Sequence, residues 1–522
     1  MDRAQMIDRL SDPAGRWDVL VIGGGATGLG VAVDSAARGY RTALVERLDF
    51  GQGTSSRSTK LVHGGVRYLR QGNVFLVVEA LRERATLLRL APHLVSPLRF
   101  VVPSYSWWEG PYYGAGLKAY DLLAGRRGLE PSRWLSAREA AEALPTIRTE
   151  GLRGGVRYVD GLFDDARLLV ALARTAAGLG ATVVNYVRVD RLLKGEGGRV
   201  EGVAATDVEA SRALTIRAKV VVNATGPFSD DLRREDDPGS RPIISPSRGS
   251  HVVLPRRFLP GDSALMIPRT PDGRVLFAIP WHDRVVLGTT DSPVDLVPIE
   301  PRPTAREVDF LLETAAGYLA EPPALGDVRS CFAGIRPLVR SGEGRNTARL
   351  SRDHHLEVSP SGLVTICGGK WTTYRKMAEV AVSRAAEVAG LPRLPCPTAD
   401  LPIQGHREGT PADDPMAVYG SDAEAVVSLS RERPGLADRL HPALPIIGAE
   451  VAWAARREMA RTVEDVLCRR TRAAFLDAEA AEEMAPAVAS LLAAELGRDP
   501  SWEEEQVAGF RQAASAYRPD RA

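Results

Sequence analysis

Hydrophobic residues near the start of the chain follow the pattern of a strand, a helix and a second strand. An apolar run at residues 19–22 ends in three consecutive glycines, as buried parallel strands do when they lead into a tight turn. Small residues at 26–37 predict a helix, and residues 41–45 predict a second apolar strand. The segment is therefore predicted to form a βαβ unit.

The glycines of this unit predict a dinucleotide site. Gly23, Gly25 and Gly28 match G-x-G-x-x-G, in which the first glycine permits the turn, the second lets backbone N–H groups approach a pyrophosphate, and the third lets helix and strand pack closely. Glu46 ends the second strand, where a carboxylate accepts hydrogen bonds from ribose hydroxyls. The alternative is a glycine-rich turn in an ordinary βα unit.

Later segments repeat or change this pattern. Residues 181–226 read as a further βα repeat whose last strand ends near Gly226, at the edge of the first glycine turn if both strands share a sheet. Residues 363–377 again give an apolar strand, two glycines and a helix start. Between them, about 242–300 has an apolar period of two, which predicts a separate antiparallel sheet.

The last part of the chain is predicted to be helical. Proline and polar residues at 391–414 are typical of a linker. Helical segments then follow, and together they predict a small all-α domain. Their ranges are 415–429, 449–470, 478–496 and 501–516.

Composition narrows the class of protein. A chain of 522 residues is too long for one core, so two or three domains are expected. The net charge of +1 does not favour nucleic-acid binding. Four scattered cysteines lack metal-type spacing, so we expect reduced thiols and no metal site. There is neither a secretory signal at the start nor a run of roughly 20 apolar residues. A cytoplasmic location is therefore expected, with any membrane contact peripheral.

Two segments combine residues with candidate chemistry. Residues 50–69 follow the nucleotide strand and hold several donors suited to phosphate or carbonyl oxygens, which favours a cofactor or substrate role over a plain solvent loop. Residues 100–134 are rich in aromatic and basic side chains, as at a membrane interface, although an aromatic lid or a dimer surface has the same composition. The first segment carries Arg57, Lys60, His63, Arg67 and Tyr68, and the second carries Trp107, Trp108, Tyr112, Tyr113, Tyr120, Trp134, Lys118, Arg126, Arg127 and Arg133.

Nine segments, in order along residues 17–379, resemble the FAD-dependent glycerol-3-phosphate dehydrogenases. They are DVLVIGGGATGLGVAVDSAARG, TSSRSTKLVHGGVRYL, FDDARL, NATGPF, GSHVVLP, IPWHDRVVLGTTDSP, GIRPL, LSRDHHLEV and GGKWTTYRKMAE. The resemblance implies an α/β fold with a Rossmann-like FAD-binding domain, an interleaved antiparallel-sheet substrate domain and a C-terminal all-α domain. The FAD-binding parts would be about 17–100, 150–240 and 328–390 within an oxidoreductase region 1–395, the substrate parts about 100–150 and 241–327, and the helical domain 396–522.

The resemblance also implies a reaction. Hydride would move from carbon 2 of sn-glycerol 3-phosphate to FAD, giving dihydroxyacetone phosphate, and electrons would pass to a membrane quinone. The region 100–134 lies at a position similar to the membrane-contact region proposed for the respiratory members, and a homodimer is a further expectation. The alternatives are a glycerol-3-phosphate oxidase that uses oxygen, or an amine or amino-acid oxidase of the same flavoprotein superfamily.

The site residues come from matching the motifs position by position. Arg67, Tyr68, Arg352 and Lys370 would anchor the substrate, and a phosphate suits such arginine forks and a lysine charge. Arg336 would lie near the flavin and the reacting carbon, while the proton acceptor is His63, a water or a neutral arginine. For FAD the matched residues are Gly23, Gly25, Gly28, Glu46, Thr54, Ser55, Ser58, Lys60, Gly226, Gly369 and Thr372.

Overall fold

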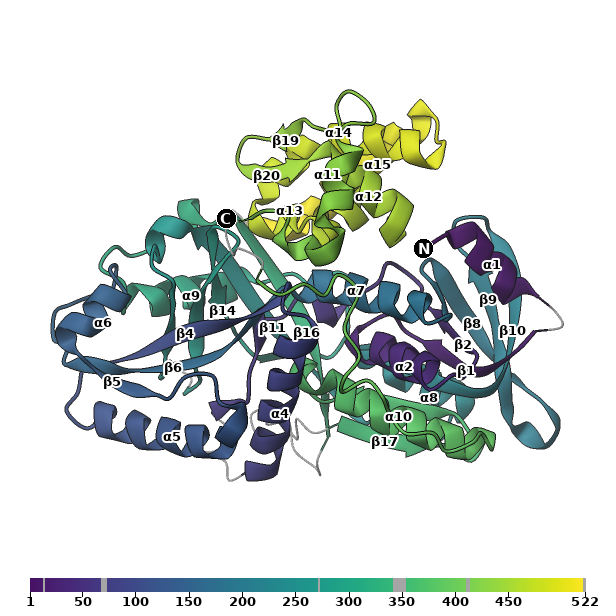
Figure 1. Cartoon of the computed structure of the whole chain (residues 1–522), viewed down its shortest axis with the longest axis horizontal. Helices are drawn as coiled ribbons and strands as arrows, with labels where there is room; N and C mark the ends of the chain where they lie inside the picture. The colour runs from purple at the N-terminus through teal and green to yellow at the C-terminus, as the bar shows by residue number, and fades with distance from the viewer. Residues whose placement is uncertain (13–14, 67–72, 271–272, 341–353, 410–413, 520–522) are drawn as a thin grey trace.

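The computed structural model describes all residues of the chain except 13–14, 67–72, 271–272, 341–353, 410–413 and 520–522. Figure 1 shows three parts: one sheet with its helices on the right, a second sheet with its helices on the left, and a helical unit above both. The helices on the two sheets are α1 (Arg3–Ser11), α2 (Ala26–Ala37), α4 (Val74–Leu90), α5 (Glu109–Ala124), α6 (Ala137–Ala143), α7 (Asp165–Gly178), α8 (Ser229–Asp236), α9 (Ala305–Ala316) and α10 (Tyr374–Ala389).

The first sheet joins the predicted parallel strands side by side. Its order is β17 (His354–Val358), β18 (Val364–Gly368), β10 (Arg212–Asn223), β1 (Arg16–Ile22), β2 (Thr42–Val45) and β7 (Thr182–Val184). β1 is parallel to both neighbours, with Val19 opposite Val220 on one side and Thr42 on the other. The predicted strands therefore share one sheet, and the turns after β1, β10 and β18 meet at its carboxyl edge.

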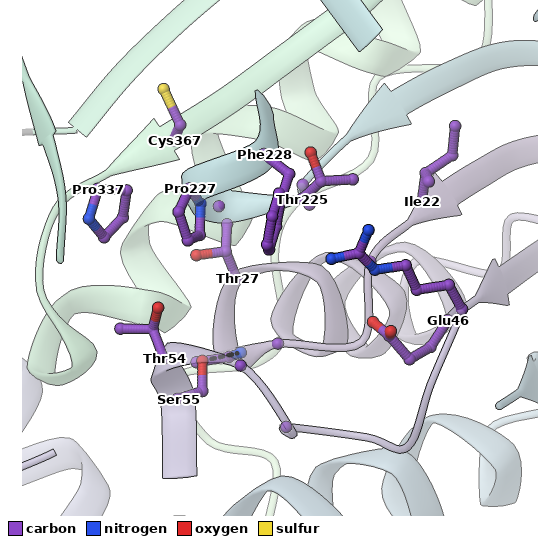
Figure 2. Close-up of a pocket in the computed structure, with 18 of the residues that line it drawn as sticks. Ile22, Thr27, Glu46, Thr54, Ser55, Thr225, Pro227, Phe228, Pro337 and Cys367 are labelled. Carbon is purple, nitrogen blue, oxygen red and sulfur yellow. Dashed lines mark hydrogen bonds between the residues drawn. The ribbon is translucent and has the colours of Figure 1, made fainter. Parts of the chain in front are cut away.

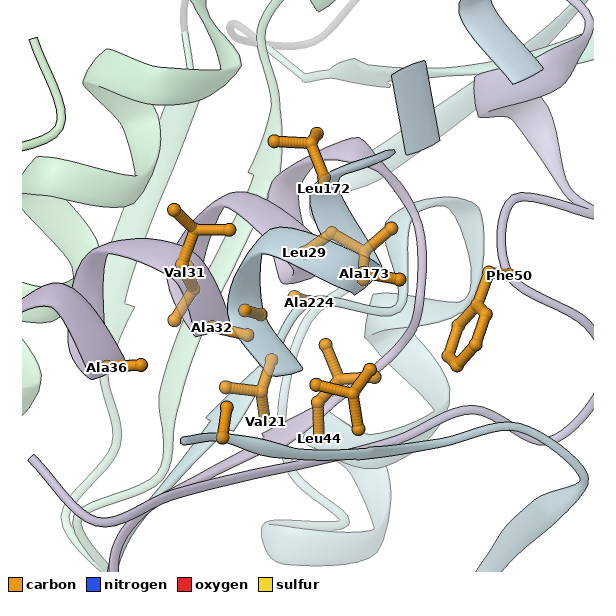
Figure 3. Packing of buried hydrophobic residues seen from close by; sticks show 14 of the residues in the cluster. Val21, Leu29, Val31, Ala32, Ala36, Leu44, Phe50, Leu172, Ala173 and Ala224 are labelled. Carbon is orange, nitrogen blue, oxygen red and sulfur yellow. The ribbon is translucent and has the colours of Figure 1, made fainter. Parts of the chain in front are cut away.

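Helix α2 packs on this sheet between α7 and α10. Figure 3 shows Val21 and Leu44 of the sheet facing Leu29 of α2, with Leu172 of α7 nearby. Small residues allow this close packing, because a Cβ at Gly30 would lie 2.8 Å from the ring of Tyr374 in α10. The fully buried apolar strand between helices is the reason the sequence pattern was continuous rather than alternating.

The predicted βα repeat at residues 181–226 is wrong in its second half. After β7, the chain forms β8 (Val187–Lys194), β9 (Val200–Asp207) and β10 as an antiparallel meander. The connections between these strands are short turns, whereas a parallel crossover needs a dozen or more residues. The glycines near residue 195 therefore mark a hairpin turn.

The second sheet is mainly antiparallel, as the period of two predicted. Its order is β15 (Ser292–Pro293), β11 (Ile244–Pro255), β14 (Arg284–Gly288), β13 (Leu276–Trp281), β12 (Ser263–Ile267), β4 (Val95–Ser104), β6 (Gly154–Phe163) and β3 (Leu61–Val62), with β16 (Ser330–Val339) on β11 and β5 (Arg133–Ser136) on β6. β3, β4, β6 and β16 come from segments assigned above to the FAD-binding parts, so the two sheets interleave along the chain. The proposed domain limits stay a prediction.

The C-terminal unit is helical, with a small hairpin that the sequence analysis missed. Its helices are α11 (Ala423–Leu429), α12 (Gly448–Glu458), α13 (Ala473–Leu476), α14 (Ala478–Leu496) and α15 (Pro500–Ala514), and its strands are β19 (Arg439–His441) and β20 (Leu444–Ile447). The predicted helix 449–470 ends at Glu458, and a π-helical turn Asp465–Arg470 follows. Arg469 and Arg470 of this turn contact Asp49, which lies in the loop after β2 of the first sheet.

Candidate active site

A cavity of about 420 Å³ opens at the carboxyl edge of the first sheet. Its size is in the usual range for cofactor and ligand sites. The three turns and the segment that follows Glu46 contribute glycines and short polar side chains to its wall, among them Thr27, Thr54, Ser55 and Thr225 (Figure 2). The sequence-predicted residues that line it are Gly23, Gly25, Glu46, Thr54, Ser55, Gly226, Gly369 and Lys370.

The first glycine turn has the geometry that its motif predicted. Gly23 has φ = +112°, a conformation that L side chains rarely adopt. A Cβ at Gly28 would lie 1.9 Å from the carbonyl oxygen of Gly23, so the helix and the turn could not approach this closely with any other residue. Gly25 is the N-cap of α2, and the first two residues of this helix, Ala26 and Thr27, line the cavity, so the positive end of the helix faces it. The turn is suited to a pyrophosphate.

Glu46 lies at one end of the cavity. Its carboxylate accepts hydrogen bonds from the N–H groups of Gly24 at 2.6 Å and Leu48 at 2.9 Å. Burial raises the pKa of Glu46, while the two backbone donors act in the opposite direction. A carboxylate has further lone pairs, so the two N–H groups orient Glu46 without using all of its capacity to accept ribose hydroxyls.

Arg47 and Phe228 are cavity residues that the sequence analysis missed. The Arg47 guanidinium lies 4.2 Å from the centroid of the Phe228 ring, and both residues line the cavity together with Glu46, which directly precedes Arg47. Such a cation–π pair offers a flat surface to a nucleotide base. The two residues are far apart in the sequence, and although Phe228 ends the NATGPF segment, nothing in the local sequence relates it to Arg47.

The segment after Glu46 is tied to two other loops at the cavity. Thr54 donates its hydroxyl hydrogen bond to the Ile335 carbonyl at 2.6 Å, and the Ser55 hydroxyl accepts from the N–H of Ala26 at 3.0 Å. The indole N–H of Trp371 donates to the Ser55 carbonyl at 2.7 Å. Thr54 and Ser55 therefore connect α2, β16 and the turn after β18 around one cavity.

Lys60 and Ser58 do not line the cavity, contrary to the expectation of direct cofactor contacts. The Lys60 ammonium is fully buried and lies 2.7 Å from the Asp165 carboxylate, with the rings of Trp281 and Phe475 around it. Ser58 donates to the same carboxylate at 2.7 Å. A buried ammonium requires a charge partner, and Asp165 provides it. Both side chains attach the segment after Glu46 to Asp165, at the start of α7, outside the cavity wall.

His63 and Lys370 are brought to the same region by Thr372. The buried Thr372 hydroxyl accepts from the N–H of His63 at 3.1 Å, whereas Lys370, two residues earlier, lines the cavity. Thr372 therefore supports the site from outside the cavity wall. Gly369 has φ = +72°, and a Cβ there would meet the Met377 sulfur at 2.4 Å, so this turn also depends on glycine.

Arg336 lies on β16, beside the cavity-lining Pro337. Its guanidinium donates to the Thr290 carbonyl and to the Thr289 hydroxyl, each at 3.0 Å. A Cβ at Gly249 would lie 2.3 Å from a guanidinium nitrogen, so Gly249 on the opposite strand leaves room for it. These contacts fix Arg336 next to the cavity.

His251, also missed by the sequence analysis, is a buried neighbour of Arg336. Burial lowers the pKa of His251 well below its usual value, and the Arg336 charge acts in the same direction. Its Nε2 lies 2.9 Å from the Thr59 hydroxyl, and its ring stacks on Phe332 at 4.6 Å. Burial and the Arg336 charge both disfavour the protonated form of the imidazole.

The other predicted substrate anchors, Arg67, Tyr68 and Arg352, lie outside the described residues. Their roles stay predictions.

The described residues fit an FAD. A helix N-terminus suits the pyrophosphate, Glu46 the ribose, and the Arg47–Phe228 pair the adenine end. Cys367 also lines the cavity, but burial raises its pKa to about 12, so it is a neutral thiol.

Comparisons with known proteins agree with this assignment. Residues 18–375 match the family model for FAD dependent oxidoreductases, and residues 364–506 match the C-terminal domain of alpha-glycerophosphate oxidase. The mitochondrial glycerol-3-phosphate dehydrogenase of Rattus norvegicus is 44% identical over 94% of this chain and 71% of its own length. The human enzyme is 42% identical over 95% of this chain and 73% of its own length.

A solved structure extends the similarity to the fold. The glycerol-3-phosphate dehydrogenase from Bacillus halodurans, complexed with FAD, aligns with a TM-score of 0.80 and 31% identity over 99% of this chain and 97% of its own. The predicted fold class and cofactor are thereby confirmed. The chain belongs to the glycerol-3-phosphate dehydrogenase family of FAD-dependent oxidoreductases.

Proposed function

We propose that this chain oxidises sn-glycerol 3-phosphate to dihydroxyacetone phosphate with bound FAD and passes the electrons to a membrane quinone. The observation that carries the proposal is the position of Lys370 in the wall of the cavity, to which Pro337, directly after Arg336, also contributes. A phosphorylated substrate needs cations close to the flavin. An amine or amino-acid oxidase would instead need a clamp for the substrate carboxylate and an apolar cage, not a cluster of four cations.

The residues of the chain divide the work of the reaction. FAD, when bound, supplies the acceptor for the hydride that leaves carbon 2. The Lys370 ammonium binds the phosphate, helped by Arg67, Tyr68 and Arg352. Arg336 donates hydrogen bonds to the carbon-2 oxygen, and His63 accepts its hydroxyl proton as the carbonyl forms. Arg336 is not the proton acceptor, because a guanidinium stays protonated in proteins.

The colour of the flavin tests this function directly. The FAD-loaded protein is expected to lose its yellow colour when sn-glycerol 3-phosphate is added without oxygen, because the substrate reduces the flavin. Glycerol and amino acids should leave it yellow. Bleaching by an amino acid, or none by glycerol 3-phosphate, would contradict the proposal.

Replacing the proposed base should affect the rate more than substrate binding. His63→Gln is expected to lower kcat about 100-fold, a typical effect of losing a general base, and to remove the acid limb of the pH–rate profile. The matched control is His355→Gln, because His355 lies on β17 and contacts Glu357 at 3.1 Å. An unchanged profile in His63→Gln would assign the proton to a water.

The electron acceptor needs its own experiment. The match of residues 364–506 to an oxidase domain keeps oxygen as the second candidate. We expect the substrate-reduced protein to be reoxidised much faster by a short-chain quinone than by dissolved oxygen in parallel time courses. The reverse order would make the protein an oxidase.

We further propose that the surface of α5 and the start of α4 contacts the membrane. The two helices form the lower edge of the molecule in Figure 1. Phe75 is 91% exposed, Leu122 83% and Trp107 78%, an unusual degree for large apolar side chains. Tyr120 is not part of this surface, because it is buried and donates to Asp160. Among the described helices, none is long and apolar enough to span a bilayer.

A pair of matched leucines tests the membrane contact. Leu122→Asp is expected to lower binding to anionic vesicles several-fold, because it places a charge in the apolar surface. Leu296 is equally exposed, at 84%, and it follows β15, which lies at the opposite end of the second sheet from β4 and β6, the strands that α5 contacts. Leu296→Asp should therefore bind vesicles like the unmodified protein. Equal binding by both variants in a sedimentation assay would place the contact elsewhere.

A further inference from the structure

The loop that follows Glu46 carries a buried carboxylate that points away from the cavity. Its residues Arg47, Leu48 and Gly51 to Ser55 line the cavity, but Asp49 does not. The Asp49 side chain is fully buried and accepts from the Nη1 of Arg470 at 2.6 Å and the Nη2 at 2.9 Å. It also pairs with the Nε of Arg469.

Both arginines belong to the π-helical turn Asp465–Arg470 of the C-terminal unit. Arg470 donates in addition to the Glu458 carbonyl at 2.8 Å, and Arg469 to the Asp465 carboxylate at 2.8 Å. These additional hydrogen bonds within the C-terminal unit hold both arginine side chains in the orientation in which they contact Asp49. Burial raises the pKa of Asp49, but the charges of Arg470 and Arg469 outweigh it and lower the pKa to about 2. The carboxylate is ionised throughout the physiological range.

The rest of the loop is attached to the cofactor side. The N–H of Gly51 donates to the Gly24 carbonyl at 3.0 Å, and that of Leu48 donates to Glu46 at 2.9 Å. Asn185, at the end of β7, donates to Asp49 at 3.1 Å. The loop thus lies between the glycine turn on one side and the C-terminal unit on the other.

We propose that the C-terminal helical unit sets the affinity for FAD by holding the cofactor loop through Arg469 and Arg470 on Asp49. This inference rests on the proposed binding of FAD in the cavity and assigns the three charged residues as positioning residues. None of their side chains lines the cavity, so they act through the loop. The expected consequence is that a change far from the flavin weakens its binding.

A second buried ion pair in the same interface provides a matched control. Arg167 of α7 forms two hydrogen bonds to Glu458 of α12, at 2.7 and 2.6 Å, and both side chains are buried. Neither residue belongs to the loop that lines the cavity. Asp49→Asn and Glu458→Gln each replace one buried carboxylate by an amide of the same shape. The first removes the charge that pairs with Arg470, and the second removes the charge that pairs with Arg167.

The experiment measures the dissociation constant of FAD and the melting temperature of each full-length variant. Stripped protein is titrated with FAD by flavin fluorescence, well below every melting temperature. Both variants should melt earlier than the unmodified protein, but only Asp49→Asn should raise the dissociation constant, by at least about tenfold. Arg470→Lys keeps the charge and loses the two-pronged contact, so it should give a smaller rise.

Two results would overturn the inference. One is unchanged FAD affinity in both Asp49→Asn and Arg470→Lys. The other is an equal loss of affinity in Glu458→Gln, which would show a general effect of the interface. If Asp49→Asn does not fold, the test is the comparison of the FAD dissociation constants of Arg470→Lys and Glu458→Gln. A failure of glycerol 3-phosphate to bleach the bound flavin would refute the proposed function alone, because this titration needs no substrate.

Discussion

Gly28→Ala is expected to produce a protein that does not retain FAD. The new methyl carbon would lie 1.9 Å from the Gly23 carbonyl oxygen, far inside van der Waals contact. Either the helix or the glycine turn must then move by about an ångström, and overpacking of this kind costs about 3 kcal/mol. Because we propose that this turn and this helix end hold the pyrophosphate, the displacement should remove flavin binding. The measurement is the flavin content of the purified variant, with its melting temperature.

Alanine is otherwise favoured in helices, so the result would separate close packing from helix propensity. The control is Gly178→Ala in α7, which does not line the cavity. No atom lies within 4 Å of the point that the Cβ of residue 178 would occupy, so alanine should fit there and FAD should be retained. A yellow Gly28→Ala protein with an unchanged melting temperature would show that the turn tolerates the methyl group.

Lys370→Ala should raise KM for sn-glycerol 3-phosphate about 100-fold while the flavin stays bound. The proposal places the ammonium on the substrate phosphate, and losing one partner of a desolvated charge pair costs about 2–5 kcal/mol, the range that contains this change. The substitution does not alter Gly369, which also lines the cavity. The measurement is steady-state kinetics with a quinone acceptor, accompanied by the flavin content.

Lys376→Ala is the control for this change. Lys376 belongs to the same motif, but it lies on α10 and pairs with Glu379 at 2.5 Å. Its loss should leave KM unchanged. If Lys370→Ala also leaves KM unchanged, Lys370 is not a substrate ligand, and the phosphate must bind elsewhere.

The chain sequence was sufficient for the features that depend on neighbouring residues. The unit β1–α2–β2 could be read from residues 19–45, because a doubly buried strand and a small-residue helix each leave a local pattern. Gly23 and Gly28 were identified because their reasons for being glycine, a positive φ and a close approach, arise within one turn. The antiparallel sheet near residues 242–300 could be predicted because the alternation of apolar and polar residues is also a local pattern.

The positions of charged side chains depended on the tertiary structure. Lys60 lies in a motif rich in donors, yet its ammonium points to Asp165, 105 residues later, because burial demands a partner that only the fold supplies. Asp49 and Arg470 are 421 residues apart and carry no pattern that relates them. Local periodicity records which face of an element is buried, whereas a charge pair depends on which elements the fold places against each other. The glycine turn could therefore be predicted from the sequence. The contacts that hold the neighbouring loop, with Asp49, against the C-terminal unit could be found only in the folded chain.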